Sequence, residues 1–196
     1  MTKPFGEIIS SSLTTWTIQC WDLEQFSPFG FLVSSDNQDA QLFGIVCAIT
    51  TGPKDAGRTP HAFGKTPLEL RHEQPHIFQL LHTQVAAIPL GYVSEDEVIY
   101  EVPKRPAHIH AFARPCSVQE FHTFFSHAQW LIVFFNLAQQ HPLFDELLVS
   151  LVHHACAHKA LTQEKMQDII DLFCLLSNND YKKLKIFLQR IEAFIY

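Results

Sequence analysis

The sequence predicts an α+β protein in which a small antiparallel β-barrel over residues 1–115 precedes an α-helical unit of about four helices over residues 116–196. Two observations predict this order. Residues 6–102 contain short segments rich in Val, Ile, Thr and aromatic side chains, separated by turn-forming residues. From residue 117 onward, apolar residues instead recur every three or four positions, which is typical of helices. The proline-rich stretch 102–115 lies where the pattern changes and marks the domain boundary.

The predicted strands follow one another through the first hundred residues. Their short, regular spacing favours a small barrel over a parallel sheet. They are "GEIISSS" (6–12), "TWTIQCW" (15–21), "GFLVSS" (30–35), "LFGIVCAITTG" (42–52), "VAAIPLGYV" (85–93) and "EVIYEV" (97–102). One short helix interrupts them, because Thr66-Pro67-Leu68-Glu69 is a capping box with proline at the first helical position.

The first long helix is predicted from Ser117, which opens a second capping box with Glu120, to Gln140. Its apolar stripe consists of Val118, Phe121, Phe125, Ala128, Ile132 and Phe135. Trp130, Val133 and Phe134 lie off this stripe and need a second apolar surface. We expect the barrel to supply it, so that the two halves pack together.

Three further helices are predicted toward the C-terminus. The second helix begins at Pro142, and its stripe runs from Phe144 through Leu148 and Leu151 to Ala155. A third helix extends from Thr162 to about Leu176. The last carries Leu184, Phe187, Leu188, Ile191, Phe194 and Ile195 inward, with Lys182, Lys183 and Lys185 on its outer side.

Composition restricts the class of protein. Hydrophobic residues make up 47% of the 196 residues and charged residues 17%, which is enough for a core and unlike a disordered chain. The net charge of −6 argues against generic binding of nucleic acid. Five scattered cysteines without a C-x-x-C pair are typical of free thiols in a reducing compartment. The N-terminus has no apolar signal region and no run is long enough to span a membrane, so we expect a soluble cytoplasmic protein.

The stretch His72-Glu73-Gln74-Pro75-His76 matches the H-E-x-x-H motif of zinc peptidases. In such enzymes both histidines lie on one helical turn, one turn apart. Pro75 lacks an N–H group and its ring clashes with the carbonyl of Arg71, so that turn cannot form. One helix ending before Pro75 and another beginning there is the simpler interpretation.

Residues 57–66, "GRTPHAFGKT", end like a phosphate-binding P-loop. That motif has four residues between its glycines, whereas Gly57 and Gly64 enclose six. We therefore predict no ATP hydrolysis by this loop. Its cations Lys54, Arg58 and Lys65 remain a minor candidate contact for an anion.

His154 and His158 in "HHACAHK" have the spacing that can chelate a metal. Cys156 points about 160° away from His158 on a helix and cannot join them, and the sequence cannot bring His108 or His110 close. No serine or cysteine lies in a recognisable nucleophile motif. No catalytic residue, cofactor or metal ligand is therefore predicted.

The rhythm of "GEIISSS", "PFGFLV" (28–33) and "FGIVCAITTG" (43–52) resembles the HAS barrel of HerA-type DNA translocases and F-type ATP synthase subunits. The whole chain is similar to small stand-alone bacterial HAS-barrel proteins whose C-terminal part is helical. The resemblance implies a six-stranded closed or nearly closed barrel, with Gly6, Gly30, Gly44 and Gly52 where strands bend or turn. It implies a barrel that docks partners and is not catalytic, and here a helical unit stands in place of the ATPase domain.

We therefore predict a non-enzymatic protein-interaction or assembly module with a protein partner. The predicted contact residues are Phe29, Lys54, Arg58 and Lys65. Two alternatives stay open: a nucleic-acid-processing accessory factor, which would use the basic face of Lys182, Lys183, Lys185 and Arg190, and a His-rich metal-dependent enzyme. The sequence does not define the oligomeric state.

Overall fold

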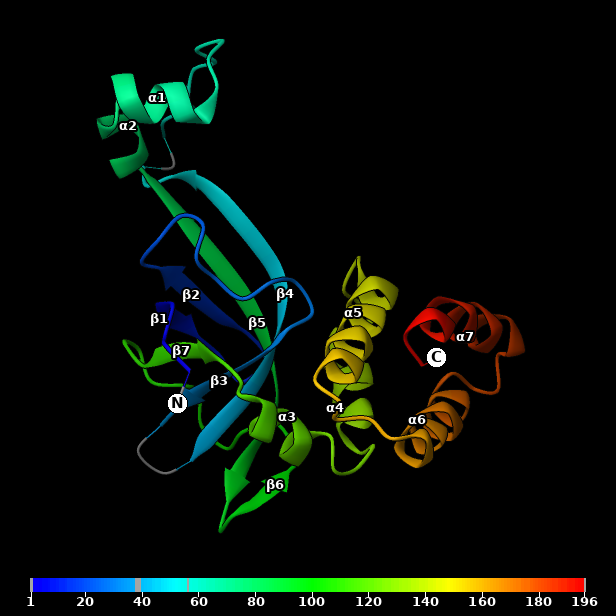
Figure 1. Ribbon diagram of the computed structural model, residues 1–196. Coiled ribbons are helices and arrows are strands. Elements are labelled where there is room, and N and C mark those ends of the chain that lie inside the picture. Colours follow the sequence, from blue (N-terminus) through cyan, green and yellow to red (C-terminus); the bar gives the residue numbers. More distant parts are fainter. Residues whose placement is uncertain (1, 38–39, 56, 196) are drawn as a thin grey trace.

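Six antiparallel strands close into a barrel in the N-terminal half of the computed structural model, which describes residues 2–37, 40–55 and 57–195 (Figure 1). The strands are β1 (Gly6–Ser11), β2 (Trp16–Cys20), β3 (Leu32–Asp36), β4 (Gln41–Pro53), β5 (Leu81–Ser94) and β7 (Phe112–Pro115). Around the barrel their order is β1-β2-β5-β4-β3-β7, and β7 pairs again with β1. The predicted fold class is confirmed.

The sixth strand of the ring is not the one that the sequence predicted. β6 (Glu97–Ile99) pairs only with β5, as a hairpin beyond the barrel. The ring is closed instead by β7, which lies inside the proline-rich stretch 102–115 at the predicted domain boundary. β7 pairs with both β1 and β3, which lie about 105 and about 80 residues earlier in the chain.

Side chains fill the interior of the barrel. Ile8, Trp16, Ile18, Val33 and Val46 are all fully buried in one core cluster. Trp16 comes so close to Gly44 of β4 that a Cβ atom there would meet its ring at 2.9 Å. The barrel is thus a packed core, as is usual for barrels of this size.

Seven helices occur in the described part of the chain. Two short ones, α1 (Pro67–Glu73) and α2 (His76–Gln79), lie between β4 and β5. The others follow the barrel: α3 (Val118–Phe124), α4 (Trp130–Ala138), α5 (Phe144–Ala157), α6 (Gln163–Leu176) and α7 (Tyr181–Ile195). None of the helices in the described residues is both long and apolar enough to cross a membrane.

The predicted helix from Ser117 to Gln140 is wrong, because residues 125–129 break it into α3 and α4. Two members of the predicted stripe, Val118 and Ile132, are exposed. The Ser117–Glu120 capping box is present. The predictions for α5, α6 and α7 are confirmed to within a few residues, and Thr162 caps α6 as expected.

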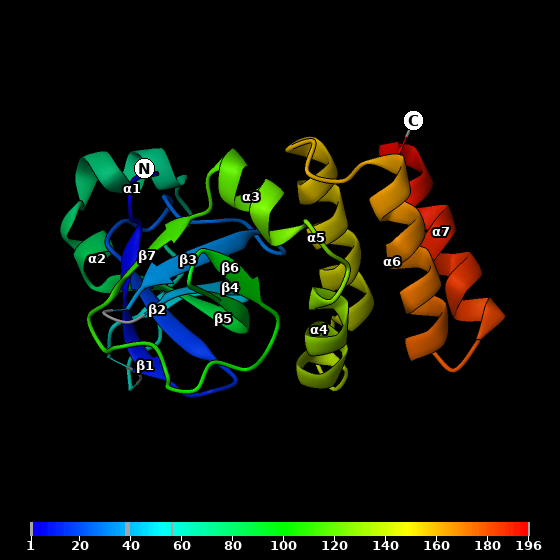
Figure 2. The same cartoon turned by 90° about the horizontal axis from the view of Figure 1, so that it is seen from below.

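The helices lie in two layers beside the barrel (Figure 2). α4 and α5 form the layer next to the barrel, and α6 and α7 form the outer layer. A single core cluster joins barrel residues such as Phe43 and Leu90 to helical residues such as Trp130, Phe134 and Leu151. The expectation that the barrel covers Trp130 and Phe134 is confirmed, since both are fully buried in this shared core.

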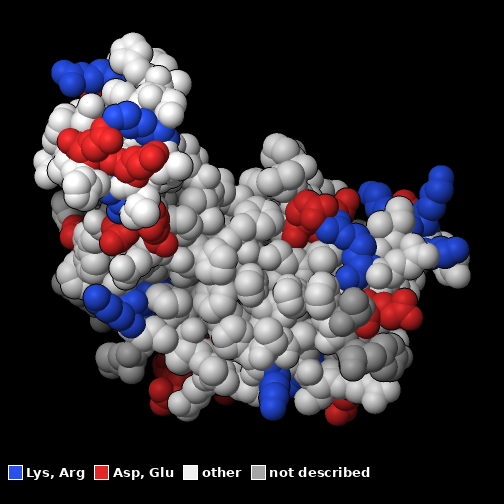
Figure 3. All heavy atoms as spheres, turned by 45° about the horizontal axis from the view of Figure 1, so that its top comes forward, with Lys and Arg blue, Asp and Glu red and all other residues white. Residues whose placement is uncertain are grey.

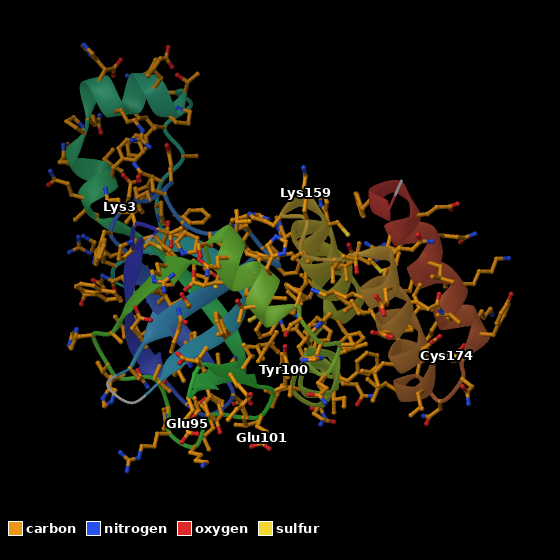
Figure 4. All side chains as sticks on the ribbon, turned by 60° about the horizontal axis from the view of Figure 1, so that its bottom comes forward. Lys3, Glu95, Tyr100, Glu101, Lys159 and Cys174 are labelled. Atoms are coloured by element: carbon orange, nitrogen blue, oxygen red, sulfur yellow. The ribbon has the colours of Figure 1, made fainter. Side chains whose placement is uncertain are left out.

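Tyr100 marks the junction between β6 and the helices (Figure 4). Its hydroxyl donates a hydrogen bond of 2.7 Å to the carbonyl of Phe124, the last residue of α3. The two rings also meet edge to face, with centroids 5.6 Å apart. Burial is the main cause that raises the pKa of Tyr100, so this hydroxyl stays protonated and able to donate.

Candidate functional site

A largely exposed arm lies between β4 and β5, defined here as residues 54–80, of which the structure describes 54–55 and 57–80; it includes α1 and α2. It projects from one end of the barrel (Figure 1). Neither α1 nor α2 contributes a buried residue, and the described residues from Lys54 to Glu69 are all exposed. Three of the four predicted contact residues, Lys54, Arg58 and Lys65, lie in this arm.

A two-stranded ribbon carries the arm. β4 and β5 continue their pairing as far as Pro53 and Leu81, and the amide of Lys54 donates to the carbonyl of Leu80 at 2.8 Å. The hydroxyls of Thr51 and Thr83 are 2.9 Å apart across the ribbon, and that of Thr83 also donates to the Leu23 carbonyl at 2.9 Å. The ribbon therefore holds the base of the arm firmly.

Polar contacts order the arm itself. Arg71 of α1 pairs with Glu24 in the loop after β2, and its guanidinium lies 4.7 Å above the centre of the Phe78 ring. Thr66 and Glu69 form the predicted capping box, with the Thr66 hydroxyl donating to Glu69 Oε2 at 2.8 Å. An isolated helix as short as α1 is unstable in water, so these contacts are what keep the arm ordered.

Several apolar side chains of the arm are exposed and are not covered by the rest of the protein. Leu68 of α1 is 80% exposed, and Phe63 and Leu80 are also exposed. The arm therefore presents apolar groups on a segment that adds nothing to either core.

Two of the arm's cations are already paired with carboxylates. Lys65 pairs with Glu73, and Arg58 Nε lies 3.3 Å from Asp55 Oδ2. The Thr66 hydroxyl is bound in the cap, whereas a P-loop needs that hydroxyl for magnesium. These contacts weaken the candidate anion site and leave the apolar groups as the arm's main feature.

The fourth predicted contact residue, Phe29, lies at the junction between the barrel and α5. Its carbonyl accepts hydrogen bonds from Ser150 Oγ at 2.9 Å and from His154 Nε2 at 3.2 Å. Its side chain is partly buried against the shared core. Gly30 follows with φ +74°, and a Cβ atom there would meet Ser150 Oγ at 2.3 Å. Phe29 therefore links the barrel to α5 and is not part of the arm.

The histidine motifs occupy separate environments. His154 bonds to Phe29, and His158 Nδ1 lies 2.8 Å from the His154 carbonyl while its ring stacks on Phe121. Burial lowers the pKa of His154, which favours the neutral ring. The described residues contain no group of three or more His, Cys, Asp or Glu side chains that could hold a metal ion.

His72 and His76 fall on two different helices. α1 ends at Glu73, and Pro75 precedes α2, as the proline predicted. His108 and His110 lie in the loop before β7, where His110 Nδ1 is 3.1 Å from Glu7 Oε2. Neither motif forms a chelating pair.

Sequence analysis missed an exposed aromatic pair on the outside of the barrel. The rings of Trp21, after β2, and Phe112, on β7, meet edge to face with centroids 5.3 Å apart. Trp21 Nε1 donates to Glu7 Oε1 at 3.2 Å. No local signal could have found this pair, because it depends on the pairing of β7 with β1.

Charged side chains are unevenly distributed over the surface. Figure 3 shows them gathered over the arm and over the C-terminal helices, whereas the face between these two regions carries few. The arm, with its exposed apolar side chains, is the candidate contact surface. Comparison of the chain with protein-family models finds no match, and comparison with curated proteins finds no significant match either.

Proposed function

We propose that this protein is a non-enzymatic docking module of the HAS-barrel kind, which binds a protein partner through the arm of residues 54–80. The observation that carries the proposal is the exposure of Phe63, Leu68 and Leu80 on an ordered segment without a buried residue in its helices. A contiguous exposed apolar patch is typical of contact sites, and we infer that these three side chains contribute to one.

Energetics support the arm as the contact element. Burying one leucine or phenylalanine side chain contributes roughly 1.5–3 kcal/mol. The contacts of Arg71 and the Thr66 cap already hold the arm in place, so a partner does not have to order it. A preorganised element loses less conformational entropy on binding.

The barrel serves in this proposal as a rigid support. Its interior is filled by Trp16, Ile18 and their neighbours, which leaves docking at the outside and at the rim. A closed ring of six strands is what the HAS-barrel resemblance implies. The five cysteines are free thiols, which supports a reducing compartment such as the cytoplasm.

A nucleic-acid-binding function has weaker support. Lys182, Lys183 and Lys185 are exposed at the start of α7, but Arg190 is paired with Glu146. The net charge of −6 also opposes binding to phosphates. A contact through the arm's apolar groups would depend little on salt, whereas phosphate binding would fall steeply with it.

The test is excision of the arm. The Lys54 amide donates to the Leu80 carbonyl at the end of the ribbon, so a two-residue Asn-Gly turn between these residues can replace residues 55–79 as a hairpin loop. We expect this variant to keep the unfolding transition of the full chain. It should lose a partner that the wild-type protein captures from native lysate and that binds again when both proteins are purified.

Two point variants make the test specific. Leu68→Asp in the arm and Leu175→Asp on α6 change leucines that are 80% and 69% exposed. Only Leu68→Asp should weaken binding of the purified partner. Equal binding by wild-type and arm-excised protein would overturn the proposal.

A further inference from the structure

The outer layer of the molecule contains a second apolar surface, a groove between α6 and α7. Cys174 lies near the end of α6, close to the turn that leads into α7 (Figure 4). The groove has a volume of about 380 Å³. Met166 and Ile170 of α6 and Leu184 and Leu188 of α7 supply its apolar lining.

α7 uses a different face for the protein's own core. Phe187 and Ile191 are buried, and Phe187 stacks on Phe173 of α6 with ring centroids 4.6 Å apart. Leu184 and Leu188 remain partly exposed beside them, and Tyr181 at the start of the same groove is 76% exposed. α7 is therefore apolar on more of its circumference than this chain covers, which predicts a further packing partner.

The charges along the groove identify that partner. Lys185 and Glu192 are the only charged side chains among the described residues that line it, and both belong to α7. They lie seven residues apart, so they share one side of the helix at a separation of two turns. No salt bridge to either is found in the described part of the chain.

We propose that the groove binds a second copy of this chain, with the two α7 helices packed antiparallel about a two-fold axis close to Leu188. In this arrangement Lys185 of each copy faces Glu192 of the other, which gives two ion pairs by symmetry. A parallel arrangement would instead bring like charges together. The side of the groove that α6 forms is uncharged, so nothing there opposes the approach of α7 from the second copy.

The antiparallel arrangement also satisfies helix packing. Tyr181 and Leu188 are seven residues apart and lie on the facing side, with Lys185 and Glu192 flanking them at matching positions. Charged residues in flanking positions set the orientation of paired helices. The two α6 helices would cover the outer sides, which completes a four-helix bundle. This inference does not rest on the proposed function of the arm, which lies at the opposite side of the molecule (Figure 1).

Charge reversal tests the arrangement. We expect sedimentation velocity over a micromolar dilution series to show the wild-type chain with twice the mass of a monomer. Lys185→Glu and Glu192→Lys each replace two attractive contacts per dimer with two repulsive ones, and each should weaken association at least about tenfold. The double variant Lys185→Glu/Glu192→Lys restores opposite charges across the axis and should dimerise again.

Lys182→Glu is the matched control, because Lys182 is exposed on the same helix and does not line the groove. It should leave association unchanged. Circular dichroism of each variant checks that the helices are intact, and recovery in the double variant separates a lost contact from misfolding. A wild-type monomer throughout the series, or a dimer that neither single reversal weakens, would overturn the proposal.

Discussion

Arg114 of β7 donates two hydrogen bonds to the carboxylate of Glu120 in α3, from Nη1 at 2.8 Å and from Nη2 at 2.7 Å. Arg114 is 9% exposed, and Glu120 is the nearer of its two carboxylate partners, since Asp36 Oδ1 lies 3.7 Å from Nη2. Glu120 also accepts from the Ser117 amide at 2.7 Å as part of the capping box. The pair therefore joins the strand that closes the barrel to the first helix beyond it.

We expect Glu120→Gln to lower the free energy of unfolding by about 2–3 kcal/mol, because the largely buried Arg114 then keeps only the more distant carboxylate of Asp36, whose Oδ1 lies 3.7 Å from Nη2. Glutamine can still serve in the capping box, so the cap is retained. Ser117→Ala removes the cap and keeps the ion pair, and should cost about 1 kcal/mol. Urea denaturation of both variants measures the difference. Equal losses would contradict the prediction that the ion pair stabilises the fold more than the cap does.

The stability that Glu120 contributes should depend on pH. Burial opposes its ionisation, but hydrogen bonds from Arg114, Ser117 and Gln41 outweigh burial and lower the pKa to about 2. A lowered pKa means that the carboxylate stabilises the fold above its unfolded value of about 4.3 and that this contribution is lost as the pH falls to about 2.

The difference in unfolding free energy between wild type and Glu120→Gln should therefore shrink by about 2–3 kcal/mol over that pH range. Other carboxylates are common to both proteins and cancel in the comparison. Urea titrations at several pH values between about 5 and 2 give the result. A difference that stays constant with pH would contradict the assignment.

Local sequence signals predicted much of this fold. Both capping boxes, at Thr66 and Ser117, and the helix boundary at Pro75 depend only on neighbouring residues, and the structure contains all of them. Strand composition likewise predicted the first four strands and the central part of β5. These features follow from local chemistry, which a single sequence carries in full.

The features that the sequence did not predict depend on contacts between residues that are far apart in the chain. Phe112–Pro115 forms a strand because β1 and β3 hydrogen-bond to it, and nothing in "FARP" itself predicts that. α3 ends after Phe124, whose carbonyl accepts a hydrogen bond from the hydroxyl of Tyr100, the residue after β6. Phe29 was predicted as a partner contact because the sequence does not show that Ser150 and His154 bind its carbonyl.

A glycine variant tests the junction at Phe29. Gly30→Ala places a side chain at φ +74° and within 2.3 Å of Ser150 Oγ, so we expect a loss of about 2–4 kcal/mol in unfolding free energy. Gly52→Ala is the control, since a Cβ atom there meets nothing within 4 Å. It should change stability by less than about 0.5 kcal/mol. Similar chemical denaturation midpoints for the two variants would argue against a tight junction.

The last prediction concerns the dependence of the two halves on each other. Leu90 of β5 and Leu151 of α5 are both fully buried in the same core cluster, although one belongs to the barrel and the other to the helices. Truncating such a leucine to alanine costs about 2–5 kcal/mol. If the shared core joins both halves, Leu90→Ala and Leu151→Ala must lower the midpoint of one common transition. Calorimetry should then show a single peak for wild type and for each variant. A fragment of residues 116–196 should aggregate, because Trp130 and Phe134 would no longer be buried in the core shared with the barrel. Two separate peaks, each moved by only one of the variants, would mean that the barrel and the helices unfold independently.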